Sequence, residues 1–158
     1  MTERRLQVQA MGNQLVLTGA IDETAGLLDM LRHAHQGHLA LDLAGVTFIN
    51  SLGVRDWIRM QAAATQSGVQ IEIRRAAEVI IHQLNMIIAT RGTSRVTSFF
   101  APYACDACGR EESLLVDAVT YAAQLARLQP PQMMCPECGS AMAFNDFPER
   151  YFSFLSPS

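Results

Sequence analysis

Four cysteines, the only ones in the 158-residue chain, form two motifs of the type Cys-x-x-Cys-Gly. Cys105 and Cys108 belong to the first motif, and Cys135 and Cys138 belong to the second, with 26 residues between Cys108 and Cys135. Two residues between paired thiolates let both sulfurs reach one ion, and the following Gly permits the positive φ that such a turn requires. The pattern predicts a tetrahedral site of four thiolates without an open coordination position, which is structural rather than catalytic.

Zinc is the ion that this ligand set favours, at one per chain, and its binding free energy would help to fold a segment too small for a large core. Two alternatives stay open. A rubredoxin-like iron centre has similar knuckles, because the ligands alone do not separate iron from zinc. Redox-active cysteines would need a reactive thiolate in a thioredoxin-like context, which the surrounding sequence lacks.

A strand, a short polar loop and an amphipathic helix are predicted between residues 39 and 64. Asn50 and Ser51 form the loop, and Ser51 is expected to cap a helix that begins near Leu52. The helix should bury one stripe of side chains, namely Val54, Trp57, Ile58 and Ala62. Its other face should turn four polar side chains toward water, namely Arg55, Asp56, Arg59 and Gln61.

The other elements of the first part complete a mixed α/β sheet with helices mainly on one face. The expected elements are strands at 5–10 and 14–20, a helix from Asp22 or Thr24 to Gly37, a strand at 69–73, a helix at 77–87 and a short strand at 96–100. The buried stripe of the helix before Gly37 is expected to contain Leu27, Leu28, Leu31 and Ala34.

The second part should contain ribbon strands at 111–117 and 140–144, separated by a strand or helix at 119–128. An aromatic tail opens with Pro148 at a first helical position. Its apolar residues are Phe147, Tyr151, Phe152, Phe154 and Leu155. The tail could cover the ribbon or the domain junction, or it could dock on a partner.

Charge divides the chain near residue 98. Residues 1–98 carry nine Arg and eight acidic residues, whereas residues 99–158 carry three Arg and seven acidic residues. We therefore predict two domains, 1–98 and 99–158. The chain contains no Lys, and its second half is acidic, which makes nucleic acid an unfavourable partner. No apolar run approaches the roughly 18 residues of a membrane span, and no secretory leader is evident, so we expect a cytoplasmic protein.

The string DLAGVTFINSLGV resembles the strand, loop and helix signature of STAS domains, the module of bacterial anti-sigma-factor antagonists, and GAIDETAGLLDML resembles their first helix. The resemblance covers roughly residues 5 to 98 and implies a STAS fold in front of a zinc ribbon. In the antagonists the loop runs Asp, Ser, Ser, Gly, and the second Ser is phosphorylated. Leu52 matches that Ser here, so the phosphorylation switch does not carry over, while Asn50 replaces the acid and Ser51 matches the other Ser.

No constellation of residues supports catalysis, since there is no phosphate loop and no nucleophile with a nearby His. The first hypothesis is a cytoplasmic signalling or scaffold protein that is not an enzyme. It would bind a protein partner through Asn50, Ser51, Leu52, Arg55 and Arg59. The alternatives are a transcription-associated module that contacts RNA polymerase or nucleic acid, and a STAS domain that senses a small molecule or nucleotide. The partner's identity and the oligomeric state are left open.

Overall fold

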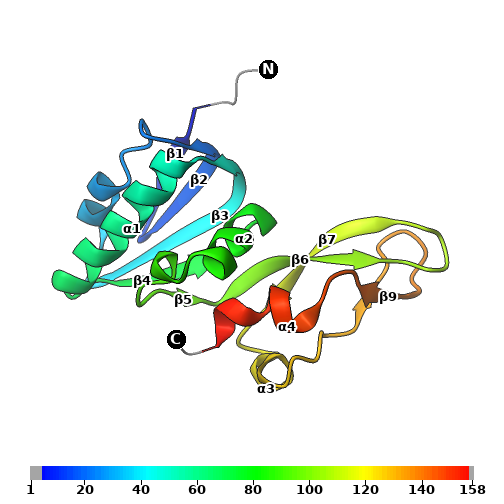
Figure 1. Ribbon diagram of the computed structural model, residues 1–158. Helices are drawn as coiled ribbons and strands as arrows, with labels where there is room; N and C mark the ends of the chain where they lie inside the picture. The colour runs from blue at the N-terminus through cyan, green and yellow to red at the C-terminus, as the bar shows by residue number, and fades with distance from the viewer. Residues whose placement is uncertain (1–4, 157–158) are drawn as a thin grey trace.

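The structure is a computed structural model and describes residues 5–156, which form two β-sheets joined end to end (Figure 1). The first sheet has the strand order β1-β2-β3-β4-β5. Its strands are β1 (Gln7–Met11), β2 (Gln14–Ile21), β3 (His38–Ile49), β4 (Gln70–Arg74) and β5 (Arg95–Val96). The first two form an antiparallel hairpin and the others pair in parallel, so the predicted mixed sheet is confirmed.

Helices cover one face of this sheet (Figure 1). They are η1 (Leu28–His33), α1 (Ser51–Gln66), α2 (Glu78–Met86) and η2 (Ile88–Thr90). The strands alternate accordingly, because Ile71 and Ile73 of β4 are buried in the core while Glu72 and Arg74 on the other face are half-exposed. Within residues 5–156, no helix is long and apolar enough to cross a membrane.

The helix expected between residues 22 and 37 is reduced to the 3-10 helix η1. The Asp22 carboxylate accepts hydrogen bonds from the backbone N–H and the hydroxyl of Thr24, which closes a local turn. Gly26 then adopts a φ of +67°, a conformation that interrupts a right-handed helix. Leu28, expected in the buried stripe, is 46% exposed as a result of this shorter, tighter helix.

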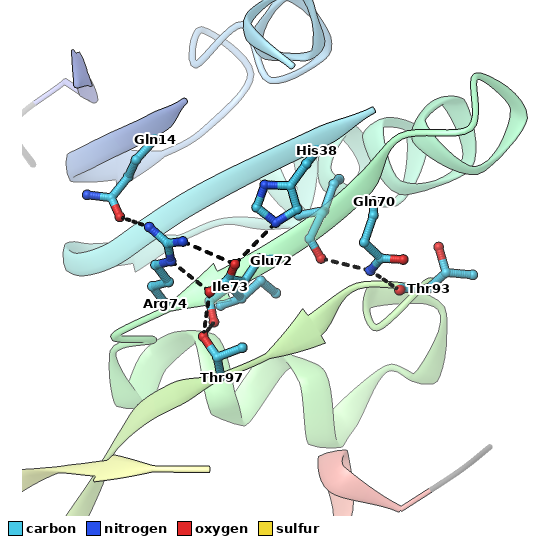
Figure 2. A network of polar contacts seen from close by, with 9 residues as sticks. Gln14, His38, Gln70, Glu72, Ile73, Arg74, Thr93 and Thr97 are labelled. Carbon is cyan, nitrogen blue, oxygen red and sulfur yellow. Dashed lines mark hydrogen bonds and ion pairs between the residues drawn. The ribbon is translucent and has the colours of Figure 1, made fainter. Parts of the chain in front are cut away.

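A polar network lies on the sheet face opposite the helices (Figure 2). The Glu72 carboxylate accepts hydrogen bonds from Arg74 Nε at 2.7 Å and Thr97 Oγ1 at 2.9 Å, and it lies 3.2 Å from His38 Nε2. Arg74 also donates to Gln14 Oε1 at 2.7 Å. The Arg74 hydrogen bond keeps the pKa of Glu72 below its usual value, so the carboxylate is charged at neutral pH. These contacts tie β2, β3 and β4 together on their polar face.

The second sheet is antiparallel, with the order β7-β6-β9-β8. Its strands are β6 (Ser98–Ala104), β7 (Glu111–Asp117), β8 (Met133–Met134) and β9 (Ala141–Phe144). The ribbon strands predicted at 111–117 and 140–144 are confirmed as β7 and β9. The segment left open as strand or helix contains α3 (Ala122–Ala126). The tail forms α4 (Pro148–Tyr151), with Pro148 at its start as predicted, and η3 (Ser153–Leu155).

The two sheets meet just after the end of β4, where Ala76 pairs with the first residues of β6. Ala76 donates its backbone N–H to Ser98 O at 3.2 Å and accepts from Phe100 N at 2.8 Å. One continuous hydrophobic cluster then extends across both sheets. The division into domains at residue 98 stays a prediction, although the chain does pass from one sheet to the other at this point.

The aromatic tail covers the junction. Phe99 is fully buried, and the rings of Phe152 and Phe154 pack against it with centroids 6.0 and 5.0 Å away. Asn85 of α2 donates to the backbone carbonyl of Tyr151 at 2.9 Å. The interpretation of the tail as cover is confirmed for these residues, whereas Phe147 remains 64% exposed.

Candidate metal centre and surface groove

The two Cys-x-x-Cys-Gly motifs fold into matching turns. Gly109 donates its N–H to Cys105 O at 2.8 Å, and Gly139 donates to Cys135 O at 2.9 Å. The two glycines have φ values of +78° and +74°, so both lie in the left-handed region. Each turn is closed by a further bond, from Cys105 N to Arg110 O and from Cys135 N to the corresponding carbonyl two residues past Cys138. The positive φ predicted for both glycines is therefore present.

The four sulfurs converge. Sγ of Cys105 lies 3.5 Å from Sγ of Cys138, Sγ of Cys108 lies 3.6 Å from Sγ of Cys135, and all four atoms are within 4.8 Å of one another. A tetrahedral ion with metal–sulfur bonds of about 2.3 Å places its sulfurs about 3.8 Å apart. Within residues 5–156, these cysteines form the one group of three or more His, Cys, Asp or Glu side chains that could hold a metal ion.

Electrostatics also favour a cation among these thiols. The backbone N–H of Ser140, its hydroxyl and the Cys105 thiol lower the pKa of Cys138 to about 6. The backbone N–H of Arg110 lowers the pKa of Cys108, but hydrogen bonds with neighbouring thiols and desolvation outweigh it and that pKa rises to about 12. Four sulfurs this close cannot all ionise together unless a cation neutralises them, so metal binding would release protons.

The centre is half-enclosed and braced from outside. Cys105 and Cys135 are buried, whereas Cys108 and Cys138 are exposed. Arg110 donates to Glu112 of β7 and to Glu137 of the second turn, at 2.5 and 3.2 Å, and so links the two turns across the site. The arrangement can hold an ion between the β6–β7 turn and the β8–β9 turn. Four sulfur ligands complete a tetrahedral shell, so no coordination position is left for a substrate.

Asn50, rather than Ser51, caps helix α1. Oδ1 of Asn50 accepts the N–H of Gly53 at 2.8 Å, while Ser51 is the first helical residue and is exposed. The predicted cap at Ser51 is therefore wrong. The reason lies in the sheet, because the N–H of Asn50 bonds Ile21 O at 3.2 Å and holds Asn50 in the extended conformation that a capping residue needs.

Gly53 is required by the close approach of α1 to β2. A methyl carbon added at this glycine would lie 2.3 Å from the carbonyl oxygen of Ile21 and 2.9 Å from its carbonyl carbon, both backbone atoms. No side chain fits such a space. The Gly in the NSLGV string thus serves helix–sheet packing, and it brings the first turn of α1 onto the end of β2.

The buried stripe of α1 differs from the prediction at two positions. Ala62 is exposed, whereas Gln61, expected in water, is only 2% exposed. Nε2 of Gln61 donates to Ser94 Oγ at 3.0 Å, because the loop before β5 folds over this side of the helix. Val54 and Trp57 are buried as predicted, and Ile58 is half-buried.

The residues predicted to bind a partner surround a groove of about 630 Å³ between α1 and α2. Its lining consists of Ile49, Asn50, Ser51, Val54, Arg55, Ile58, Arg59, Gln83 and Ile87. Leu52 is 40% exposed in the first turn of α1, next to this lining. The five predicted residues thus lie at the start and in the N-terminal half of α1, and Leu52 is outside the core.

Asp56 is the acidic neighbour of the groove arginines. It lies 3.2 Å from Arg55 Nε and 3.7 Å from Arg59 NH1, which leaves much of both guanidinium groups free for a partner. Sequence reasoning missed the contribution of Gln83 in α2 and of Ile87, the residue just after this helix. The sequence did place apolar residues at the end of the helix predicted at 77–87, but this pattern does not indicate which element the helix end packs against.

In comparisons with known proteins, no family model, no curated protein and no solved structure matches the chain significantly.

Proposed function

We propose that the protein is a non-enzymatic, cytoplasmic signalling or scaffold protein whose first part is a STAS-like domain that binds a protein partner. The observation that carries this proposal is the apolar groove between α1 and α2, with Leu52 exposed beside it and Arg55 and Arg59 on its rim. An apolar anchor flanked by arginines is the composition of an interface hot spot.

The order of elements supports the STAS-like assignment. The DLAGVTFINSLGV string lies on β3, Asn50 and the start of α1, which is the strand, loop and helix order that the resemblance implies. An antiparallel hairpin followed by parallel strands, with helices on one face, is also the arrangement expected from it. Leu52 at the phosphoacceptor position favours a partner site that is set by shape and charge and not by phosphorylation.

The side chains that line the groove indicate which kind of partner segment it could bind. The floor is apolar, with Ile49, Val54 and Ile87, and no acidic side chain belongs to the lining. The rim arginines favour a partner segment that places a carboxylate beside an apolar side chain, because a charge-assisted bond to Arg is strong when part of it is shielded from water.

A double substitution tests the groove. Leu52→Asp with Arg55→Glu should weaken binding of a partner purified from the native cell by about 2 kcal/mol or more, which is roughly a 30-fold rise in Kd. Leu28→Asp with Arg32→Glu is the matched control, since it makes the same change at an exposed Leu and Arg on η1. Affinity that survives the first pair, or falls equally with the control pair, would contradict the proposal.

We further propose that the cysteine cluster holds one structural Zn²⁺. Support comes from the closed set of four sulfurs at tetrahedral spacing and from the paired turns that present them. Elemental analysis should find about one zinc per chain. A red, iron-rich preparation would instead establish the rubredoxin-like alternative, and protein without metal after expression in ample zinc would reject both. Cys105→Ser should remove the metal and unfold the second sheet.

A further inference from the structure

The first sheet has one unprotected edge, the strand β1. This strand lies at the outer side of the sheet, away from the second sheet, and pairs only with β2 (Figure 1). All five of its residues, from Gln7 to Met11, are exposed. They include no charged residue and no proline, two of the devices by which natural edge strands discourage further pairing. Val8 is 42% exposed and Met11 is 56% exposed.

The other sheet edges are short or protected. β5 and β8 have two residues each, and β5 is followed by Thr97, whose carbonyl accepts the N–H of Ala118, the residue just after β7. β7 is as long as an ordinary strand, but it carries Glu111, Glu112 and Asp117, and a second copy of it would meet like charges. Among the four edges of the described sheets, β1 alone is both long enough and neutral enough to accept another strand.

The hairpin geometry shows which backbone groups of β1 are available. The loop at residues 12–13 has two residues, and Met11 pairs with the residue just after it. In such a hairpin the pair next to the loop is hydrogen-bonded, so Met11 and Gln9 direct their N–H and C=O groups to β2. Val8 and Ala10 therefore direct theirs outward. An antiparallel partner can bond both residues at once.

We propose that β1 is a self-association edge, on which a second copy of this chain adds its own β1 in antiparallel orientation. A two-fold axis through Gln9 places Val8 of each copy opposite Ala10 of the other, and these are the residues with free backbone groups. The two Gln9 side chains then face each other, where amides can hydrogen-bond. The strand is neutral, so self-pairing brings no charge repulsion, and the two five-stranded sheets become one continuous sheet.

The sequence of β1 favours a second copy of this chain as the partner that pairs with it. A closed two-fold pairing needs a segment that is complementary to itself, and β1 meets this need with its central Gln9 between Val8 and Ala10. The contact involves five residues of each chain, so the association is weak and depends on protein concentration. It uses none of the groove residues, and it stands whether or not the proposed partner binding is correct.

Charges introduced at the two-fold axis test the proposal with the 158-residue chain. Sedimentation velocity at concentrations from about 10 µM to about 1 mM, the affinity range of small interfaces, should show a monomer–dimer equilibrium for the wild type. Gln9→Lys and Gln9→Glu should each raise the dimer Kd at least tenfold, because like charges meet at the axis. An equimolar mixture of the two variants should restore the dimer, a recovery that misfolded protein cannot produce.

A second variant separates backbone pairing from side-chain effects. Val8→Pro removes an outward N–H and leaves the bonds to β2 in place, so the monomer should keep its fold and lose the dimer. Val8→Thr keeps the N–H and the β-branched shape, and should keep the dimer. A wild type that stays monomeric up to 1 mM, dimers unaffected by Gln9 charges, or a mixture that shows no recovery would each overturn the proposal.

Discussion

Gly53→Ala should destabilise the protein, although Ala is the better helix former. The added methyl carbon would lie 2.3 Å from the Ile21 carbonyl oxygen, where ordinary contact begins at 3.4 Å. Both partners are backbone, so no side chain can rotate away, and the first turn of α1 must move off β2 by about 1 Å. This movement also stretches the bond from Asn50 N to Ile21 O, which is already 3.2 Å long.

The size of the effect follows from three contributions. Overpacking a tight site costs about 1–3 kcal/mol, and loss of the hydrogen bond costs about 1 kcal/mol. The higher helix propensity of Ala stabilises the folded state by at most about 1 kcal/mol relative to Gly, and by less in the first turn of a helix. We expect the free energy of unfolding to fall by about 2 kcal/mol.

Urea unfolding followed by tryptophan fluorescence measures this change. Trp57 is the only tryptophan, it is buried in α1, and its Nε1 donates to Thr90 O at 2.7 Å, so its emission reports the helix directly. The midpoint should fall while the slope with urea stays the same. Ala62→Gly, on the exposed side of α1, calibrates the helix preference in the same element. A Gly53→Ala midpoint equal to or above that of the wild type would refute the reasoning.

Three further predictions use the same protein. Asn50→Ala should lower the free energy of unfolding by about 1 kcal/mol, whereas Ser51→Ala should change it by less than about 0.5 kcal/mol; equal losses in urea would contradict the capping assignment. If the cysteines hold Zn²⁺ as proposed, a chelator should abolish the near-ultraviolet circular dichroism of the rings of Phe144, Tyr151 and Phe152, and added Zn²⁺ should restore it. Burial raises the pKa of Tyr103 to about 12, and its hydroxyl donates to Pro131 O. The folded state then holds this proton more tightly than the unfolded state, so stability should fall as the pH rises from about 10 to 12 and should fall less in Tyr103→Phe.

Local sequence patterns predicted the features of this protein that depend on neighbours in the chain. The spacing of the cysteines and their following glycines predicted two equivalent turns, because the turn geometry is decided within five residues. The alternation in residues 69–73 predicted β4 and its buried face for the same reason. The strands predicted at 5–10 and 14–20 followed from such local patterns, whereas the strand predicted at 96–100 is divided: β5 ends at Val96, and residues 98–100 belong to β6 of the second sheet.

Features that depend on distant segments were predicted less well. Asn and Ser are about equally good caps, so the sequence could not choose between Asn50 and Ser51, and the choice is made by Ile21, which fixes the backbone of Asn50. Gln61 is buried by a loop that lies 33 residues further along the chain. The groove forms because α2 packs beside α1. The periodicity of a helix predicts which of its faces is buried, but not which other element packs against that face.

Phe99 is synthesised well before the C-terminal residues that pack against it. The rings that bury Phe99 belong to Tyr151, Phe152 and Phe154, which leave the ribosome about 50 residues later, an interval of roughly 3 to 10 seconds at ordinary rates of translation. The first sheet can pair its strands before then, but Phe99 at the junction lacks the three aromatic rings that pack against it during the whole interval. We expect the nascent chain to be most vulnerable to misassociation, and most dependent on chaperones, in this window between synthesis of β6 and arrival of the tail.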